Sequence, residues 1–389
     1  MVAFDAGART ERVEENGMAH FLEHLVFKGG EKFATYRDVN EGAERIGAVL
    51  NAYTSHDLVA FHITARAERA MEAADLLTDF VGRPRIDSEE LDRERGVVVQ
   101  EIARANDQPS TVAEHLIDEA AFGNHPLGRP VLGPAEHIRD TFTRDGIIAF
   151  RARRWAPSRG GAFLVGNLEH LPAGPELDEL FLRFPSHPEP EAFEAAPPFE
   201  PRTRVQERDS NQSHLRMSYR PTVDTTSPKD RAALLIYSTL LGGTMGSRLF
   251  DEIREQRGLA YSVGSFAHAY ADTPILQISA GLDSSKCIEA YSRMREIVTE
   301  LRDQGPTESE VERARAYSAG ARTIMFENTG AVARHAAHQS IVYGEEVDSD
   351  SLIKLLDEVT HAEVTDVARR VADELSLACV GPHTADEFD

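Results

Sequence analysis

Two histidines and a glutamate within five residues could bind a metal ion and use it. The run His20-Phe21-Leu22-Glu23-His24 has the spacing H-x-x-E-H. In a helix of about 3.6 residues per turn, His20 and His24 lie one turn apart on one face, and Glu23 shares that face. Two neutral imidazoles at this spacing suit zinc, and the glutamate can hold a water molecule beside the metal. The alternative is a pair of surface histidines next to a glutamate on an amphipathic helix.

A catalytic zinc site needs a third protein ligand, and a second acidic segment can supply it. Glu94 and Glu101 lie two helical turns apart in the segment 89–106, which is rich in helix formers. Both side chains therefore lie on one helix face. Glu101 is the candidate third ligand, and Glu94 could hold a ligand in place from behind. A solvated acidic stripe is the alternative, because most helix glutamates face water.

These residues together resemble the pitrilysin (insulinase) family of zinc metallopeptidases, and most closely its short-chain members, which are similar to the mitochondrial processing peptidase. The zinc motif is followed, further along the chain, by Glu101. Similar runs extend along nearly the whole chain. They are Glu94-Arg95-Gly96-Val97-Val98-Val99-Gln100-Glu101, Asn51-Ala52-Tyr53-Thr54-Ser55, Gly123-Asn124-His125-Pro126-Leu127-Gly128-Arg129-Pro130, Val165-Gly166-Asn167, and Ser247-Arg248-Leu249-Phe250 ahead of Arg254-Glu255-Gln256-Arg257-Gly258-Leu259-Ala260-Tyr261.

The resemblance implies a role for each residue of the metal site. One zinc ion (Zn2+) per chain is expected, bound by His20, His24 and Glu101. Glu94 is expected to hold a ligand in place. Glu23 is expected to act as the general base, which takes a proton from water and passes it to the leaving amine. The chain is therefore expected to be a zinc metalloendopeptidase.

The resemblance also implies where a peptide binds. Asn51 and Ala52 are expected to lie along the substrate, next to the strand at 58–64. The edge of that strand is expected to add the peptide through main-chain hydrogen bonds. Arg254 and Tyr261 would bind the substrate, and Tyr261 would also assist the oxyanion that forms during the reaction. On residue types alone, an ordinary surface ion pair and a core-edge tyrosine would be the favoured interpretation of this pair.

The composition excludes several other classes of protein. The chain has 42 Lys and Arg against 65 Asp and Glu, a net charge of −23, so it lacks the basic surface that nucleic acid or an anionic membrane requires. No apolar run reaches transmembrane length, and the N-terminus lacks the apolar core of a signal peptide, so a cytoplasmic protein is expected. Cys287 and Cys379 form no metal-ligand pattern and no disulfide framework.

The elements that must position these residues fall into two similar halves. The metal-binding helix is expected at about 16–28, ending near Gly29, and the acidic helix at 89–106. A proline-rich, acidic stretch at 185–203 is expected to be a linker. The predicted domains are an N-terminal zinc-bearing domain, residues 1–184, and a homologous C-terminal domain with the Arg/Tyr pair, residues 204–389.

A local repeat supports this division. The run from Glu90 to Arg95 resembles the run from Glu310 to Arg315. At the same displacement along the chain, Glu94 corresponds to Ala314 and Glu101 to Ala321. The second half therefore keeps the scaffold and lacks the acidic zinc residues, as a duplicated domain with one chemical half would. Chance similarity between helices rich in Glu and Arg is the alternative.

The sequence thus predicts an α+β protein of two homologous sandwich domains, each an antiparallel sheet packed with helices, joined by an extended linker. Its expected function is the zinc-dependent hydrolysis of peptides or unfolded proteins. Because the family builds a peptide chamber from four such domains, a homodimer is expected, with a heterodimer as the alternative. The competing function is a non-catalytic or zinc-binding partner subunit of a heteromeric peptidase complex.

Overall fold

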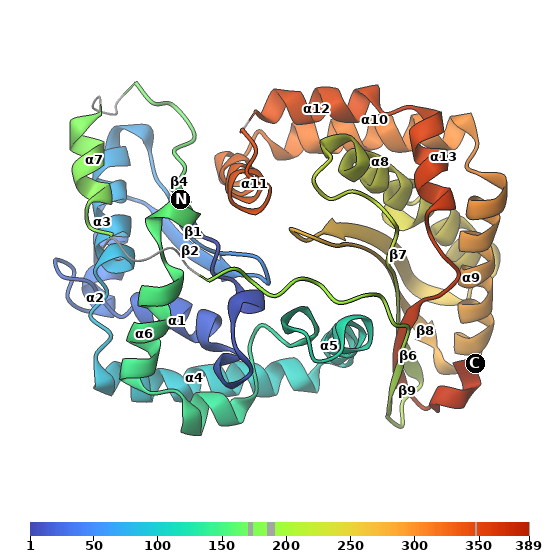
Figure 1. Ribbon diagram of the computed structural model, residues 1–389, viewed down its shortest axis with the longest axis horizontal. Helices are drawn as coiled ribbons and strands as arrows, with labels where there is room; N and C mark the ends of the chain where they lie inside the picture. Colours follow the sequence, from blue (N-terminus) through green and yellow to red (C-terminus); the bar gives the residue numbers. More distant parts are fainter. Residues whose placement is uncertain (170–173, 185–190, 347, 389) are drawn as a thin grey trace. The chain divides into compact units, whose positions relative to one another are not determined.

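The computed structural model describes residues 1–169, 174–184, 191–346 and 348–388, which divide into two compact units (Figure 1). Each unit contains one sheet with helices packed on it, which confirms the predicted α+β class. Unit 1 consists of residues 1–104, 129–194 and 326–347, and unit 2 of residues 105–128, 195–325 and 348–389.

The sheet of unit 1 has four strands in the order β2-β3-β1-β4, all antiparallel. They are β1 (Val2–Phe4), β2 (Val49–Thr54), β3 (Val59–Thr64) and β4 (Gly160–Ala162). Helices with apolar faces bury this sheet in a core that includes Phe21, Phe61, Phe80 and Trp155. The helices are α1 (Met18–Val26), α2 (Tyr36–Arg45), α3 (Ala70–Gly82), α4 (Ser88–Asp107), α6 (Arg144–Arg154), α7 (Pro175–Phe181) and α11 (Thr329–Val342).

Helix α1 carries the H-x-x-E-H residues, and its two ends are fixed by local contacts. At the start, the buried carboxylate of Glu11 accepts hydrogen bonds from the backbone N–H groups of Gly17, at 2.9 Å, and Ala19, at 2.7 Å. This satisfies donors that a helix leaves unpaired at its first turn. Just beyond the end, Gly29 has φ 137° and lies so close to Ala34 that a Cβ would be 2.4 Å from its carbonyl oxygen. The expected glycine stop is therefore present.

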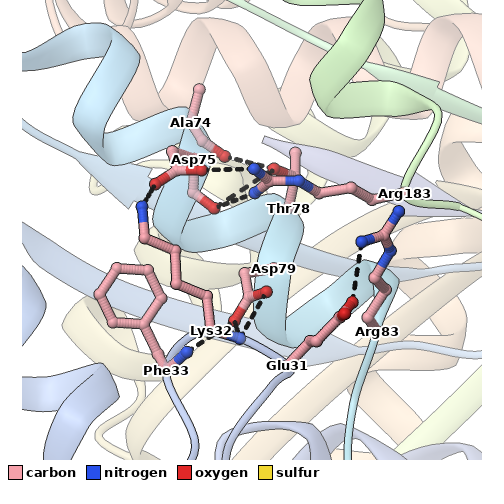
Figure 2. A network of polar contacts seen from close by, with 9 residues as sticks. All are labelled: Glu31, Lys32, Phe33, Ala74, Asp75, Thr78, Asp79, Arg83 and Arg183. Atoms are coloured by element: carbon pink, nitrogen blue, oxygen red, sulfur yellow. Dashed lines mark hydrogen bonds and ion pairs between the residues drawn. The ribbon is translucent and has the colours of Figure 1, made fainter.

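A network of polar contacts ties the loop after α1 to helix α3 (Figure 2). The buried carboxylate of Asp79 accepts hydrogen bonds from the backbone N–H groups of Lys32, at 3.1 Å, and Phe33, at 3.0 Å. One turn earlier, Asp75 bridges the Lys32 ammonium and the guanidinium of Arg183, each at 2.5 Å. Because these bonds join a loop, a helix and the chain after α7, they fix the position of the end of α1.

The sheet of unit 2 has five strands in the order β5-β9-β6-β8-β7. The pair β5–β9 is parallel and the other pairs are antiparallel. The strands are β5 (Thr203–Glu207), β6 (Gln212–Tyr219), β7 (Ala260–Ala269), β8 (Pro274–Asp283) and β9 (Ser376–Gly381). The helices of this unit are α5 (Pro109–Phe122), α8 (Pro228–Ser238), α9 (Cys287–Gln304), α10 (Glu308–Met325), α12 (Ser349–Glu358) and α13 (His361–Arg369).

One helix of each half of the chain packs on the sheet that the other half builds. Helix α5 contacts β9 and β6 in unit 2, whereas α11 contacts β4 and β1 in unit 1 (Figure 1). The two helices are equivalent, because the displacement that relates Glu94 to Ala314 also relates both ends of α5 to both ends of α11. Because of this reciprocal exchange, each compact unit combines segments from both halves of the chain. The division into homologous halves 1–184 and 204–389 therefore differs from the division into compact units, and it stays a prediction from the sequence.

Equivalent side chains of the two helices make equivalent contacts. Ile117 of α5 packs against Ala378 of β9. Its equivalent in α11, Ala337, packs against Ala3 of β1 and Ala60 of β3. Each helix thus buries the same position of the repeat against a sheet.

The predicted linker at 185–203 falls partly outside the described residues, which exclude 185–190. Residues 191–202 have no regular secondary structure and lead into β5. Within the described residues, no helix is both long and apolar enough to cross a membrane.

Candidate metal centre

The fold brings His20 and His24 of α1 next to Glu101 of α4. Glu101 Oε2 lies 3.8 Å from His20 Nε2 and 3.4 Å from His24 Nε2. The two imidazole rings are 4.6 Å apart between centroids. One ligand atom from each of the three residues lies within 4.8 Å of the others. Two helices that are far apart in the chain thus present two nitrogens and one oxygen to a common point.

A second carboxylate orients His24 from behind. Glu94 Oε1 lies 2.8 Å from His24 Nδ1, and Glu94 Oε2 lies 2.5 Å from the Lys28 ammonium. Glu94 is only 4% exposed, so it depends on these two partners. Burial tends to raise the pKa of Glu94, but the hydrogen bonds with His24 and Lys28 outweigh it and lower the pKa overall. With Nδ1–H donated to Glu94, His24 presents the lone pair of Nε2 to a metal.

The two histidines have opposite electrostatic environments. Burial, and then the nearby charge of His24, lowers the pKa of His20 to about 3, so His20 is neutral and its ring can ligate a metal. For His24, burial also acts to lower the pKa, but Glu94, Glu101 and Glu23 outweigh it and raise the pKa. This accumulation of carboxylates around a histidine pair suits a cation.

Glu23 lies on the helix that carries both histidines and is held by a residue of the sheet. Its Oε2 accepts a hydrogen bond of 2.5 Å from the Thr54 hydroxyl. Burial raises the pKa of Glu23, against the opposing effects of the Thr54 bond and of His24, while the charge of Glu101 adds to the rise. A carboxylate with a raised pKa is a better proton acceptor near neutral pH than an ordinary surface carboxylate.

The free edge next to this centre belongs to β2, not to the strand predicted from sequence. β3 is paired on both sides, with β2 and β1, so the expectation that the strand at 58–64 offers its edge to a peptide is wrong. β2 pairs only with β3 among the described residues, and it carries Asn51 and Ala52. The Asn51 side chain accepts a 2.9 Å hydrogen bond from the Ala52 N–H. Strands β2 and β3 form one hairpin, which explains why pattern alone did not distinguish them.

Arg254 and Tyr261 lie together in unit 2. Arg254 lies near the end of a stretch of π-helix (Phe250–Gln256), and its guanidinium lies 4.7 Å from the Phe250 ring centroid and 5.9 Å from that of Tyr261. Tyr261 is 84% exposed and sits at a bulge of β7, where the register shifts between Ala260 and Ser262. A bulge turns a side chain out of the regular pleat, so this tyrosine projects into solvent.

Two residues at the centre were not singled out from sequence. Lys28 follows His24 by one turn of α1 and pairs with Glu94. Thr54 lies in the Asn51–Ser55 run but received no role. The i, i+4 spacing of His24 and Lys28 was a usable signal, because both side chains lie on one helix face. Nothing local pairs Thr54 with Glu23, since 31 residues separate them.

Comparison with known proteins identifies the family. Residues 1–135 match the family model described as Insulinase (Peptidase family M16), and residues 141–317 match the one described as Peptidase M16 inactive domain. The chain belongs to this peptidase family. The resemblance inferred from the zinc motif and the Arg/Tyr pair is therefore confirmed. The name of the second model agrees with a second half that has alanines at the positions of Glu94 and Glu101.

Similar proteins match this chain along almost its full length. An uncharacterized zinc protease of Streptomyces coelicolor is 30% identical over 384 residues, which cover 97% of this chain and 83% of the relative. An uncharacterized zinc protease of Bacillus subtilis is 28% identical, covering 97% of this chain and 91% of the relative. Both relatives are named as zinc proteases, which agrees with the family to which this chain belongs.

Solved structures show the same fold. A structure described as the peptidase M16 inactive domain from Pseudomonas fluorescens has a TM-score of 0.89 and 21% identity, covering 99% of this chain and 92% of that one. A protease from Helicobacter pylori has a TM-score of 0.86 and 20% identity, covering 98% and 92%. At these identities the likeness concerns the fold alone.

Proposed function

We propose that the protein is a zinc-dependent endopeptidase that hydrolyses peptides and unfolded proteins. The observation that carries this proposal is the convergence of His20, His24 and Glu101, with Glu23 on the helix that carries both histidines. Charges of His24 and Glu101 act on Glu23, so the proposed base and the proposed ligands share one site.

The residues fit a zinc ion. His20, which burial keeps neutral, has a buried Nδ1 without a partner among the described residues, and His24 has its Nδ1 held by Glu94. Together with Glu101 they supply two neutral imidazoles and one carboxylate, a ligand set that suits a catalytic zinc and leaves a position open. When bound, zinc supplies a Lewis acid that polarises a peptide carbonyl and acidifies a water molecule.

The chain's own residues then perform the proton transfers. Glu23 accepts a proton from water and returns it to the leaving amine, so it acts first as base and then as acid. Thr54 keeps the Glu23 carboxylate in one orientation through its hydrogen bond. Glu94 keeps His24 in the tautomer that ligates metal. Lys28 offsets the charge of Glu94, which would otherwise be a buried carboxylate held by a single partner.

A peptide would bind along the free edge of β2. Main-chain hydrogen bonds to an edge strand hold an extended peptide with little demand on its side chains, which suits unfolded substrates. Thr54, at the end of this strand, bonds Glu23, so the peptide edge and the general base are joined by one residue. Asn51 would release the Ala52 N–H, which its side chain holds in the free protein, to a substrate carbonyl.

Arg254 and Tyr261 would complete the site by binding substrate and donating to the oxyanion. They lie in unit 2, whereas the metal residues lie in unit 1. The family resemblance favours a homodimer, in which the zinc residues of one copy work with the Arg/Tyr pair of the other by two-fold symmetry. Support comes from the exposure of Tyr261, which leaves its hydroxyl available to a ligand.

The test is hydrolysis of a quenched fluorescent peptide by the purified chain, with metal content measured in parallel. Glu23→Gln should lower kcat by about 10²- to 10⁴-fold and keep zinc, because a general base is lost and no ligand is. Glu101→Gln should lose zinc. Glu89→Gln, on the same helix with a side chain 79% exposed, is the matched control and should change neither.

Two outcomes would redirect the interpretation. Normal hydrolysis by Glu23→Gln would show that the assigned base is wrong. Zinc bound by His20, His24 and Glu101 without hydrolysis of any peptide in a diverse library would favour the non-catalytic partner subunit over the enzyme.

A further inference from the structure

A second cluster of metal-binding side chains lies in unit 2, and the proposed peptidase reaction does not use it. Cys287 begins helix α9, Cys379 lies in strand β9, and His383 follows that strand. Both cysteines are 0% exposed and reduced, and His383 is 6% exposed. The two sulfurs and one ring nitrogen of His383 lie within 4.8 Å of one another.

A carboxylate orients the histidine of this cluster. Glu387 Oε2 lies 2.8 Å from His383 Nδ1, one helical turn later in the chain. With Nδ1–H donated to Glu387, the lone pair of Nε2 points inward. This is the arrangement that Glu94 and His24 show at the candidate zinc centre, and it is typical of histidines that bind metals. In the free protein the Ser213 hydroxyl oxygen lies 2.9 Å from both Nε2 and the Ser284 hydroxyl oxygen, so its single proton can turn to Ser284 when Nε2 is released.

The backbone around the cluster favours thiolates and close approach. Cys287 is the first residue of an 18-residue helix, where unpaired N–H groups and the helix dipole stabilise negative charge. At Gly381 a Cβ would lie 2.4 Å from the Ser213 hydroxyl, so only glycine lets the chain bring His383 to the sulfurs.

We propose that Cys287, Cys379 and His383 form a buried site for one thiophilic monovalent ion, Cu(I). Two thiolates and an imidazole are the soft ligands that select Cu(I), which is stable with three ligands. Zinc would need a fourth ligand, and the burial of the cluster leaves water no access. Binding breaks two S–H bonds, releases two protons to solvent and moves no electron. This site is independent of the proposed peptidase centre.

The C-terminal segment forms the cover of the site. The 3-10 helix Ala385–Phe388 places the Phe388 ring 5.8 Å from His383 and 5.4 Å from Tyr291, measured between centroids. Phe388 is 4% exposed, whereas the Glu387 side chain is 42% exposed. Because this helix has only four residues, its local opening would admit an ion without unfolding the sheet.

The test is an anaerobic titration of the reduced, full-length chain with Cu(I) in competition with a chromogenic copper chelator. A His24→Ala background removes copper binding at the other histidine cluster. One Cu(I) per chain should be withdrawn from the chelator, with a thiolate-to-copper charge-transfer band in the ultraviolet. Cys287→Ser and Cys379→Ser should each abolish this binding, with circular dichroism confirming that the variants fold.

Glu387→Gln keeps the proposal testable if the cysteine variants fold poorly, because its side chain is accessible. It should weaken Cu(I) binding by about 10- to 100-fold. Glu374→Gln, an exposed glutamate of the same unit, is the matched control and should have no effect. Unchanged copper stoichiometry in both cysteine variants would overturn the proposal. So would a stronger uptake of Zn2+ than of Cu(I), or a Cys287–Cys379 disulfide in a chain whose reduced form binds no copper.

Discussion

Helices α4 and α10 are equivalent elements with different chemistry. They carry the two copies of the repeated run, and three equivalent positions, which are 91, 94 and 98 in α4 and 311, 314 and 318 in α10, are buried in both. Glu94 is 4% exposed and its equivalent Ala314 is 5% exposed. Glu101 and its equivalent Ala321 are both accessible to solvent. The scaffold therefore provides one buried and one accessible position on each helix, and only the first half fills them with carboxylates.

The difference shows what a buried carboxylate requires. Glu94 is stable at its position because His24 and Lys28 bond it. Ala314 instead belongs to the large apolar cluster of unit 2. The equivalent glutamates Glu90 and Glu310 also differ, because Glu310 accepts two bonds from Arg248, at 2.6 and 3.0 Å, whereas Glu90 pairs with Arg93 of its own helix. The first half thus places carboxylates of this helix at the candidate metal centre, whereas the second half uses a carboxylate of the helix to hold the unit together.

The largest effect should come from placing the glutamate found at position 94 of α4 at the equivalent position 314 of α10. Ala314→Glu would bury a carboxylate in an apolar cluster without the partners that Glu94 has, and we expect a loss of about 3 kcal/mol or more in the free energy of unfolding. Ala321→Glu, at the accessible position, should change it by less than about 0.5 kcal/mol. Urea unfolding of both variants measures the difference, and equal stabilities would show that position 314 is no more buried than position 321.

The second prediction tests the division of labour between the units. Tyr261→Phe removes a hydroxyl from unit 2 and should lower kcat by about 10²-fold, by analogy with the loss of one oxyanion donor. Zinc content should be unchanged, because no ligand of unit 1 is touched. Tyr317→Phe, at another exposed tyrosine of unit 2, is the control and should keep full activity. Normal kinetics in Tyr261→Phe would remove this residue from the reaction.

Mixing the inactive variants extends this test to assembly. If a homodimer pairs the zinc residues of one copy with Tyr261 of the other, Glu23→Gln mixed with Tyr261→Phe should regain part of the activity, because some mixed dimers contain one intact site. No recovery under conditions of demonstrated subunit exchange would count against a shared site. An active species that sediments as a monomer would exclude it.

The third prediction gives α4 the alanine that α10 has at the equivalent position. Glu94→Ala leaves His24 without its orienting partner and should weaken zinc binding by about 10- to 100-fold, as measured by competition with a zinc chelator. Glu89→Ala is the control on the same helix and should bind zinc normally. If Glu94→Ala keeps full affinity, the contact between Glu94 and His24 does not support the metal site.

The smallest effect should come from Glu310, whose equivalent in the first half, Glu90, pairs with Arg93 of its own helix. Burial acts to raise the pKa of Glu310, but bonds from Arg248 and Thr307 outweigh it and lower the pKa to about 2. The folded state thus holds this proton more weakly than the unfolded chain, so the stabilisation is present above about pH 4.5 and is lost as the pH falls towards 2. Glu310→Gln should cost about 1–2 kcal/mol at neutral pH, with a gap to the wild type that narrows in acid. If the difference in free energy of unfolding between Glu310→Gln and the wild type did not change with pH, packing of the Glu310 side chain and not its charge would account for the stabilisation.

Local spacing determined part of this protein. The residues His20, Glu23 and His24 share one helix, so the helical period alone places them on one face, and the family resemblance added Glu101. The class of fold was also predictable, because alternating strand patterns, glycine stops and the repeated run are properties of short segments. The family followed from the resemblance of the zinc motif and the Arg/Tyr run.

Pairings between distant segments were decided only by the tertiary structure. Which strand holds the free edge depends on the order of the whole sheet, so β2 could not be told from β3 by pattern. The exchange of α5 and α11 depends on which sheet each helix face fits, although the two helices occupy equivalent places in the repeat. Likewise, Thr54 meets Glu23 only because a strand packs beside α1.

The two cysteines show most clearly what could not be predicted from the sequence. In the sequence they lie far apart and form no ligand pattern with His383. The start of helix α9 and the end of strand β9 nevertheless bring all three together inside unit 2. Contacts within one helix or strand can be predicted from the spacing of residues in the sequence, because the local geometry is fixed. Contacts between different elements cannot be predicted from spacing, because they depend on how whole faces pack once the elements have formed.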